Sequence, residues 1–165
     1  MENEQKKWFA ISEAKDLVLD INNAISKTRE KSWQLLAFLI GINAFFITSL
    51  EYNTNYVLIY GTFTICLVFD IFISINLMFC MMPNKIISNG GYPNLILNVI
   101  KQEQEPEGVD FFTVMISNYN YAIEANTKTL LKMTGLYKKS LTGFITLCCS
   151  LFVFILLYFY LIKLN

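Results

Sequence analysis

Four long stretches without a charged residue constrain this chain more than any other feature of its sequence. Residues 32–50, 52–69, 71–84 and 140–162 contain no Asp, Glu, Lys or Arg. About 18 or more predominantly apolar residues are enough to cross the hydrocarbon core of a bilayer. Soluble domains usually carry about 25% charged residues, whereas this chain carries 16% and is 55% hydrophobic. The sequence therefore predicts an integral membrane protein and disfavours a soluble enzyme, a secreted disulfide scaffold or a disordered tail.

Three apolar runs, 33–50, 56–82 and 141–162, are predicted to be transmembrane helices. The first is the shortest, and at 1.5 Å per residue it spans about 27 Å, which is just enough for the hydrocarbon core. The connector at 51–55 is so short that the second helix must return antiparallel beside the first. Pro83 follows the second run and is expected to end its helix.

Residues 1–31 are polar and charged, yet five apolar side chains recur in them at spacings of three and four. These are Ile11, Ala14, Val18, Ile21 and Ile25. The spacing predicts an amphipathic helix, with Ser12 as its N-cap. Its polar face mixes both charges, whereas a helix on a membrane surface usually has a strongly basic polar face. We therefore expect this stripe to pack against another helix of the protein.

Residues 83–139 form the largest segment outside the apolar runs. They begin with a Pro-, Gly- and Asn-rich stretch that predicts a loop, and a polar linker follows at 101–108. A helix is expected from about Asp110 to Lys139, with Asn126 taking one position of an apolar stripe that comprises Phe112, Ile116, Tyr119, Ile123, Leu130, Met133 and Tyr137. No proline separates it from the last run, so we expect one continuous helix of about 50 residues, about 75 Å long.

The predicted fold class is an all-α membrane protein with three transmembrane helices and a cytoplasmic helical bundle. Both amphipathic stripes need a partner in water, so the bundle is expected to form from the N-terminal helix and the long helix that continues into the last span. Twelve of the thirteen basic residues lie in 1–31 and 83–139, and none lies in 51–55. The positive-inside rule places these two segments in the cytoplasm and the C-terminus outside. A hairpin in the last run would need a helix breaker near the middle of 141–162, and none is present there.

Residue counts argue against several kinds of site. The chain has no histidine, which removes Ser-His-Asp and Cys-His catalysis and every His-ligated metal site. The four cysteines lack the paired spacing of zinc sites and are expected to be small apolar membrane residues. Zero net charge and the lack of a basic low-complexity tract argue against direct nucleic-acid binding. We therefore expect no catalytic residues, no metal and no resident cofactor.

Asp70 lies near the middle of the second apolar run. A charged carboxylate there costs about 2.5–3.5 kcal/mol on insertion scales, which suggests a functional group. One interpretation is a carboxyl group that lines a pore, senses protons or bonds between subunits. The alternative is a protonated Asp70 that bonds to a neighbouring helix for packing.

Further polar side chains lie in the same runs: Asn43, Asn76, Thr62, Thr64 and Ser74. Such groups can bond between helices, at about 0.6–2 kcal/mol each. With Asp70 they are the candidates for gating, although packing or oligomer contacts are expected more than ion coordination. Gly41, Gly61 and Gly143 are expected to permit close approach of helices.

A set of basic residues lies near the membrane ends of the two amphipathic helices. It comprises Arg29, Lys31, Lys128, Lys132, Lys138 and Lys139, and we name it the basic collar. The first interpretation is contact with anionic lipid together with the positive-inside signal. The second is a site for an anionic ligand such as a nucleotide or another phosphate-bearing signal, or for a partner protein.

Four stretches carry a resemblance to a known family: KSWQLLAFLIGINAFF, LMFCMMP, DFFTVMISNY and EANTKTLLKMTGLYKKSLTGF. Within them, Lys31 and Ser32 precede the first run, Pro83 follows the second, and residues 132–138 precede the third. Over residues 10–163 the chain resembles the membrane module of Pycsar-type transmembrane effectors. It is similar also to the small membrane effectors of CBASS and retron antiphage systems.

The resemblance implies a non-enzymatic antiphage effector in the bacterial inner membrane. Such proteins respond to a cyclic nucleotide or a partner protein, assemble into homo-oligomers and permeabilise the membrane, causing abortive infection. These 165 residues hold no cyclic-nucleotide-binding domain, which some members append. That departure favours control by a sensor protein, such as a cyclase or a reverse transcriptase complex.

The residues alone leave an alternative open. A non-enzymatic adaptor would hold a soluble partner through helices 1–31 and 110–139. A transporter is less expected, because three spans show no repeat and hold one acidic residue.

Overall fold

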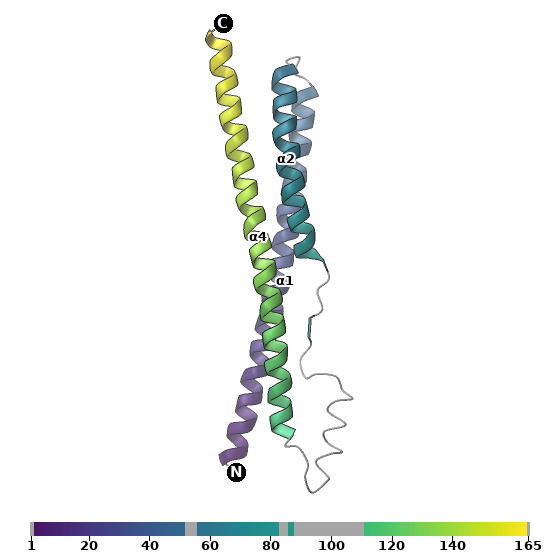
Figure 1. Cartoon of the computed structure of the whole chain (residues 1–165), viewed down its shortest axis with the longest axis vertical. Helices are drawn as coiled ribbons and strands as arrows, with labels where there is room; N and C mark the ends of the chain where they lie inside the picture. Colours follow the sequence, from purple (N-terminus) through teal and green to yellow (C-terminus); the bar gives the residue numbers. More distant parts are fainter. Residues whose placement is uncertain (1, 52–55, 83–85, 88–110, 165) are drawn as a thin grey trace. The chain divides into compact units, whose positions relative to one another are not determined.

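Three helices make up almost all of the described structure (Figure 1). They are α1 (Glu2–Glu51), α2 (Tyr56–Met81) and α4 (Phe111–Leu164), and the described residues contain no strand. All three are long and apolar enough to cross a membrane, so the all-α class with three membrane-length helices is confirmed.

The computed structural model describes residues 2–51, 56–82, 86–87 and 111–164. The predicted connector therefore lies almost entirely outside the described residues. The same holds for most of the predicted loop, for Pro83 and for Asp110.

The two long helices are continuous. Helix α4 runs from Phe111 to Leu164 without a break, as expected from the lack of proline. The prediction of Ser12 as an N-cap is wrong, because Ser12 lies inside α1, which begins at Glu2. Residues 2–11 contain no Gly or Pro and include several strong helix formers, and acidic side chains at the start suit a helix N-terminus.

The chain divides into two compact units. The first contains residues 1–27 and 83–132, and the second contains residues 28–82 and 133–165. Helices α1 and α4 contribute residues to both units, whereas α2 belongs to the second.

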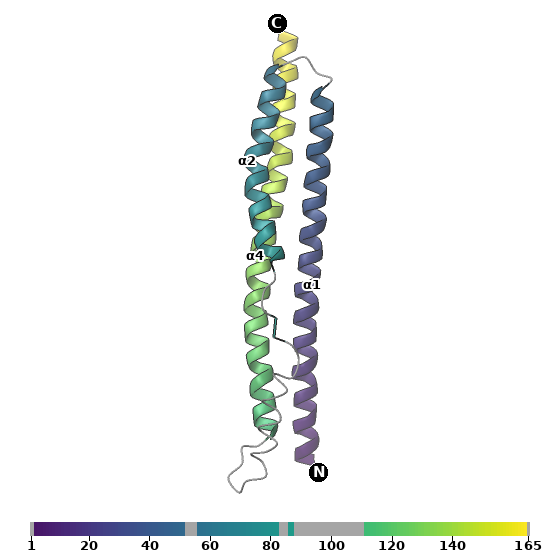
Figure 2. The ribbon, with the colours of Figure 1, turned by 90° about the vertical axis from the view of Figure 1, so that its right-hand side faces the viewer.

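In the first unit, the two predicted apolar stripes pack on each other. Ile11 and Val18 of α1 form a buried cluster with Tyr119 and Ala122 of α4. The beginning of α1, in purple, runs beside the beginning of α4, in green, in both views of the ribbon (Figures 1 and 2). The two apolar stripes predicted this contact, because an amphipathic helix in water buries its apolar face by packing it against another apolar surface.

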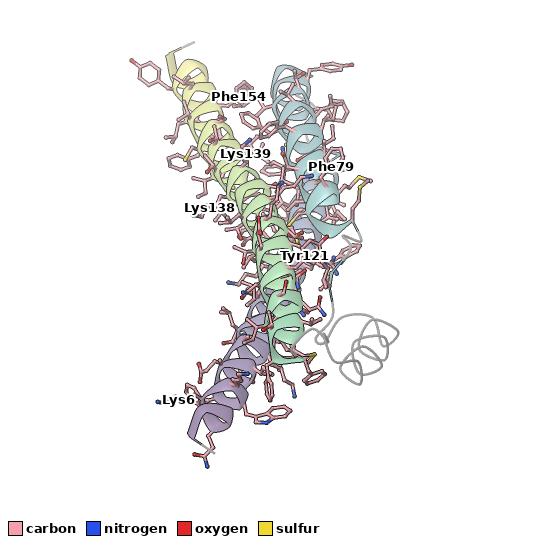
Figure 3. The ribbon with its side chains drawn as sticks, turned by 60° about the horizontal axis from the view of Figure 1, so that its bottom comes forward. Lys6, Phe79, Tyr121, Lys138, Lys139 and Phe154 are labelled. Atoms are coloured by element: carbon pink, nitrogen blue, oxygen red, sulfur yellow. The ribbon has the colours of Figure 1, made fainter. Side chains whose placement is uncertain are left out.

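In the second unit, all three helices contribute to one core. The buried cluster comprises Leu35 and Leu39 of α1, Cys66, Ile73 and Leu77 of α2, and Leu147 and Leu151 of α4. Glycines bring α2 and α4 together at two levels. A Cβ on Gly61 would overlap the ring of Phe154, which is labelled in Figure 3, and a Cβ on Gly143 would lie 3.2 Å from Ile73 Cγ1.

Candidate functional site

A hydrogen bond joins Asn43 of α1 to Asp70 of α2 inside the second unit. Asn43 donates its Nδ2–H to Asp70 Oδ2 over 2.6 Å. Both side chains are half-buried and lie among apolar neighbours. Asp70 therefore has a partner on a neighbouring helix of the same chain.

The same two side chains each keep an oxygen that accepts nothing. Asn43 Oδ1 and Asp70 Oδ1 are buried and have no hydrogen-bond partner. A buried acceptor without a partner loses its hydration and gains nothing in exchange, at about 1–3 kcal/mol. The pair is therefore only half satisfied as it stands.

A pocket of about 230 Å³ opens beside this pair, between α1 and α2. Thr62 and Cys66 lie on the same face of α2 as Asp70, because the three residues are spaced four apart. The lining residues are Asn43, Phe46 and Ile47 of α1, and Thr62, Phe63, Cys66, Leu67, Asp70 and Ile71 of α2. The structure thus brings together Asn43, Thr62 and Asp70 from the predicted set of polar residues.

The other predicted polar residues do not line this pocket. Asn76 donates its Nδ2–H to the carbonyl oxygen of Phe72 over 2.8 Å. Thr64 donates its hydroxyl to the carbonyl oxygen of Tyr60, also over 2.8 Å. Ser74 is half-buried. Asn76 and Thr64 therefore bond within their own helix instead of joining the Asp70 pair.

A second, larger pocket of about 530 Å³ lies between α1 and α4 and is almost wholly apolar. It is lined by Ala37, Phe38, Gly41, Ile42, Phe45, Phe46, Cys148, Leu151, Phe152 and Ile155. Gly41 faces this open space, and a Cβ there would meet nothing within 4 Å. Within the described chain, no helix lies close to Gly41, whereas neighbouring side chains do lie close to Gly61 and Gly143.

One polar contact among the three helices was not predicted from the sequence. The Ser32 hydroxyl donates to the Thr28 carbonyl oxygen over 2.9 Å and lies 3.1 Å from Cys80 Sγ. The Cys80 thiol donates to the carbonyl oxygen of Met133 over 3.6 Å. No sequence pattern indicates that Ser32, Cys80 and Met133 lie close together.

Asn126 makes the most extensive side-chain hydrogen bonding of the described part of the first unit. Its Nδ2 donates to Asn22 Oδ1 over 2.8 Å and to the Ile87 carbonyl oxygen over 3.0 Å. Its Oδ1 accepts the Ile87 backbone N–H over 3.1 Å. This fully buried amide therefore holds the backbone of Ile87 against α4 as a neighbouring strand would. An asparagine inside an apolar stripe was the only signal of this role.

The residues of the basic collar are divided between the units. Lys128 and Lys132 belong to the first, and the other four belong to the second. The five lysines are exposed, and Figure 3 labels Lys138 and Lys139 on α4. Arg29 is half-buried, and its Nε and Nη2 are buried without a hydrogen-bond partner. The collar as one surface stays a prediction.

The described residues offer no group of three or more His, Cys, Asp or Glu side chains that could hold a metal ion. All four cysteines are free: Cys66 and Cys80 are buried, and Cys148 and Cys149 are exposed. No protein-family model, curated protein or solved structure matches this chain.

Proposed function

We propose that this chain is an effector of bacterial antiphage defence that oligomerises and permeabilises the inner membrane on an infection-triggered signal. The observation that carries the proposal is the convergence of Asn43, Thr62 and Asp70 on one pocket between the apolar parts of α1 and α2. Ionisable side chains in membrane-length helices usually face a bundle interior or a water-filled path and mark ion or proton routes. Asp70 and its neighbours would line or gate the lesion.

In this proposal the three apolar runs span the inner membrane, with the N-terminus cytoplasmic and the C-terminus outside. The contact between the two amphipathic stripes then forms the cytoplasmic bundle. Large apolar side chains stay exposed along the second unit, among them Phe63, Ile71 and Phe152. Such side chains suit lipid contact and contact with further copies of the chain.

The test is the membrane potential of bacteria that express the chain from an inducible promoter, with and without phage infection, followed with a voltage-sensitive dye. We expect depolarisation and growth arrest. Asp70→Leu and Asn43→Leu should abolish both effects. Asn76→Leu should preserve them, because Asn76 lies on α2 like Asp70 but bonds to the Phe72 carbonyl oxygen of that helix. Equal amounts of each variant in the membrane fraction exclude a loss of the protein itself as the cause. A normal potential in infected cells that contain the protein would reject the proposal.

Lys128 and Lys132, the residues of the basic collar in the first unit, are the proposed binding residues for the trigger, either a phosphate-bearing signal such as a cyclic nucleotide or a sensor protein. Guanidinium and ammonium groups are the usual partners of phosphate. Binding of labelled cyclic nucleotides to the purified protein tests the first possibility. Lys128→Glu combined with Lys132→Glu should weaken that binding at least tenfold, and unchanged binding would remove these two lysines from the site.

The alternative, an adaptor, is favoured by one observation in the first unit. Trp8, Phe9, Tyr121 and Leu131 are 56%, 67%, 66% and 69% exposed, although their segments are the charged ones. Large apolar side chains that stay exposed on charged segments offer contact area to a partner protein. An adaptor would retain a soluble partner at the membrane without changing the potential, so the dye experiment separates the two functions.

A further inference from the structure

We propose that Asn43 and Asp70 form a proton-binding site that joins α1 to α2. Asp70 holds a proton on Oδ1 and donates it to Asn43 Oδ1. The two side chains then close a ring of two hydrogen bonds, one in each direction.

The geometry of the pair carries this proposal. A carboxyl group and a carboxamide have the same planar shape, and one of the two bonds of such a ring is already present, from Asn43 Nδ2 to Asp70 Oδ2 over 2.6 Å. The atoms that would make the second bond are the two that remain buried and unpaired. If Asp70 is ionised, Asp70 Oδ1 and Asn43 Oδ1 are both acceptors and cannot bond to each other. A single proton on Asp70 Oδ1 gives both atoms a hydrogen-bond partner.

The surroundings also favour a neutral carboxyl group. The pocket beside the pair is lined by apolar side chains apart from Asn43, Thr62, Cys66 and Asp70 itself, and none of its lining residues is a Lys or Arg. Cys66 is the titratable neighbour on α2, and Cys148 of α4 lines the other pocket. An ionised group without a cationic partner is expensive in such surroundings, and it usually takes up a proton instead.

Loss of the proton would have a defined effect. It would break the second hydrogen bond, leave a negative charge beside the 230 Å³ pocket, and weaken the contact of α1 with α2. The inference does not rest on antiphage function, because any membrane protein with this pair would hold the proton in the same way.

The test is infrared difference spectroscopy of the purified full chain in lipid nanodiscs at neutral pH. Wild type minus Asp70→Asn should show the C=O band of a protonated carboxylic acid, which shifts in D₂O. Asn43→Leu should move this band to higher frequency, because the acid loses its amide partner. Asn76→Leu is the matched control and should leave the band in place.

A second measurement covers the variants' stability. Asp70→Asn keeps a ring of two bonds and should melt within a few degrees of the wild type at neutral pH, whereas Asp70→Leu should melt well below it. At high pH the wild type should lose stability relative to Asp70→Asn. Carboxylate bands for Asp70 at neutral pH would overturn the proposal. So would a melting temperature that rises with Na⁺ but not with choline, because a bound cation would then occupy the site.

Discussion

At the scale of single residues, Asn126 is the clearest case of a buried polar group whose bonds are all made. Replacing it with Leu keeps the number and branching of the side-chain heavy atoms but leaves the Ile87 backbone N–H and carbonyl and the Asn22 side chain without their partner. Each buried group left unpaired costs about 1–3 kcal/mol. We therefore expect Asn126→Leu to lower the melting temperature of the detergent-solubilised protein clearly, as followed by circular dichroism.

Asn118 provides the matched control on the same helix. Its Nδ2 is buried and has no hydrogen-bond partner. Removing a buried amide that makes no bond relieves a desolvation penalty, so Asn118→Leu should leave the melting temperature unchanged or raise it. Equal losses in both variants would contradict the assigned role of Asn126.

At the scale of helices, the contact of α2 with α4 depends on the missing side chain of Gly61. A methyl group there would overlap the ring of Phe154, and overpacking of this kind costs about 1–3 kcal/mol. We expect Gly61→Ala to lower the melting temperature, and we expect Phe154→Leu to restore part of the loss in the double variant. Two losses that simply add would show that the residues do not touch.

Gly41→Ala should act in the opposite direction. A Cβ at Gly41 meets nothing within 4 Å, and Ala is favoured over Gly inside a helix by about 1 kcal/mol. The variant should therefore melt at the same temperature as the wild type or above it. A loss as large as that of Gly61→Ala would place a neighbouring helix, or a second copy, against Gly41.

The helical segments and their buried faces could be predicted from the sequence, because both follow from local patterns, whereas the start of α1 at Glu2 was missed. The three-and-four spacing correctly indicated Ile11 and Val18 as core residues, and the absence of proline indicated the continuity of α4. The Asn43–Asp70 bond could not be predicted, because it depends on how α1 and α2 are rotated about their own axes. The open face at Gly41 could not be predicted for the same reason. Whether a glycine is packed, as Gly61 is, or open, as Gly41 is, depends on where the neighbouring helices lie.

At the scale of the whole molecule, the net charge is zero, but the basic residues are distributed unevenly along the chain. Twelve of the thirteen basic residues lie in the two segments next to the spans, and the connector at 51–55 has none. This asymmetry is what determines orientation under the positive-inside rule. It predicts three crossings that put the N-terminus and residues 83–139 on the cytoplasmic side.

Single cysteines in a chain whose four native cysteines are replaced by Ala test this topology. In intact spheroplasts, a membrane-impermeant maleimide should label Asn53→Cys and Asn165→Cys at once, and should label Lys15→Cys and Lys128→Cys only after the membrane is opened. The position of Asn165 is decisive, because a hairpin in residues 141–162 would return it to the cytoplasm while leaving the other three unchanged. Labelling of Lys15→Cys and Lys128→Cys from opposite sides would rule out a shared cytoplasmic bundle, since the helices that carry them could then not pack on each other in one compartment.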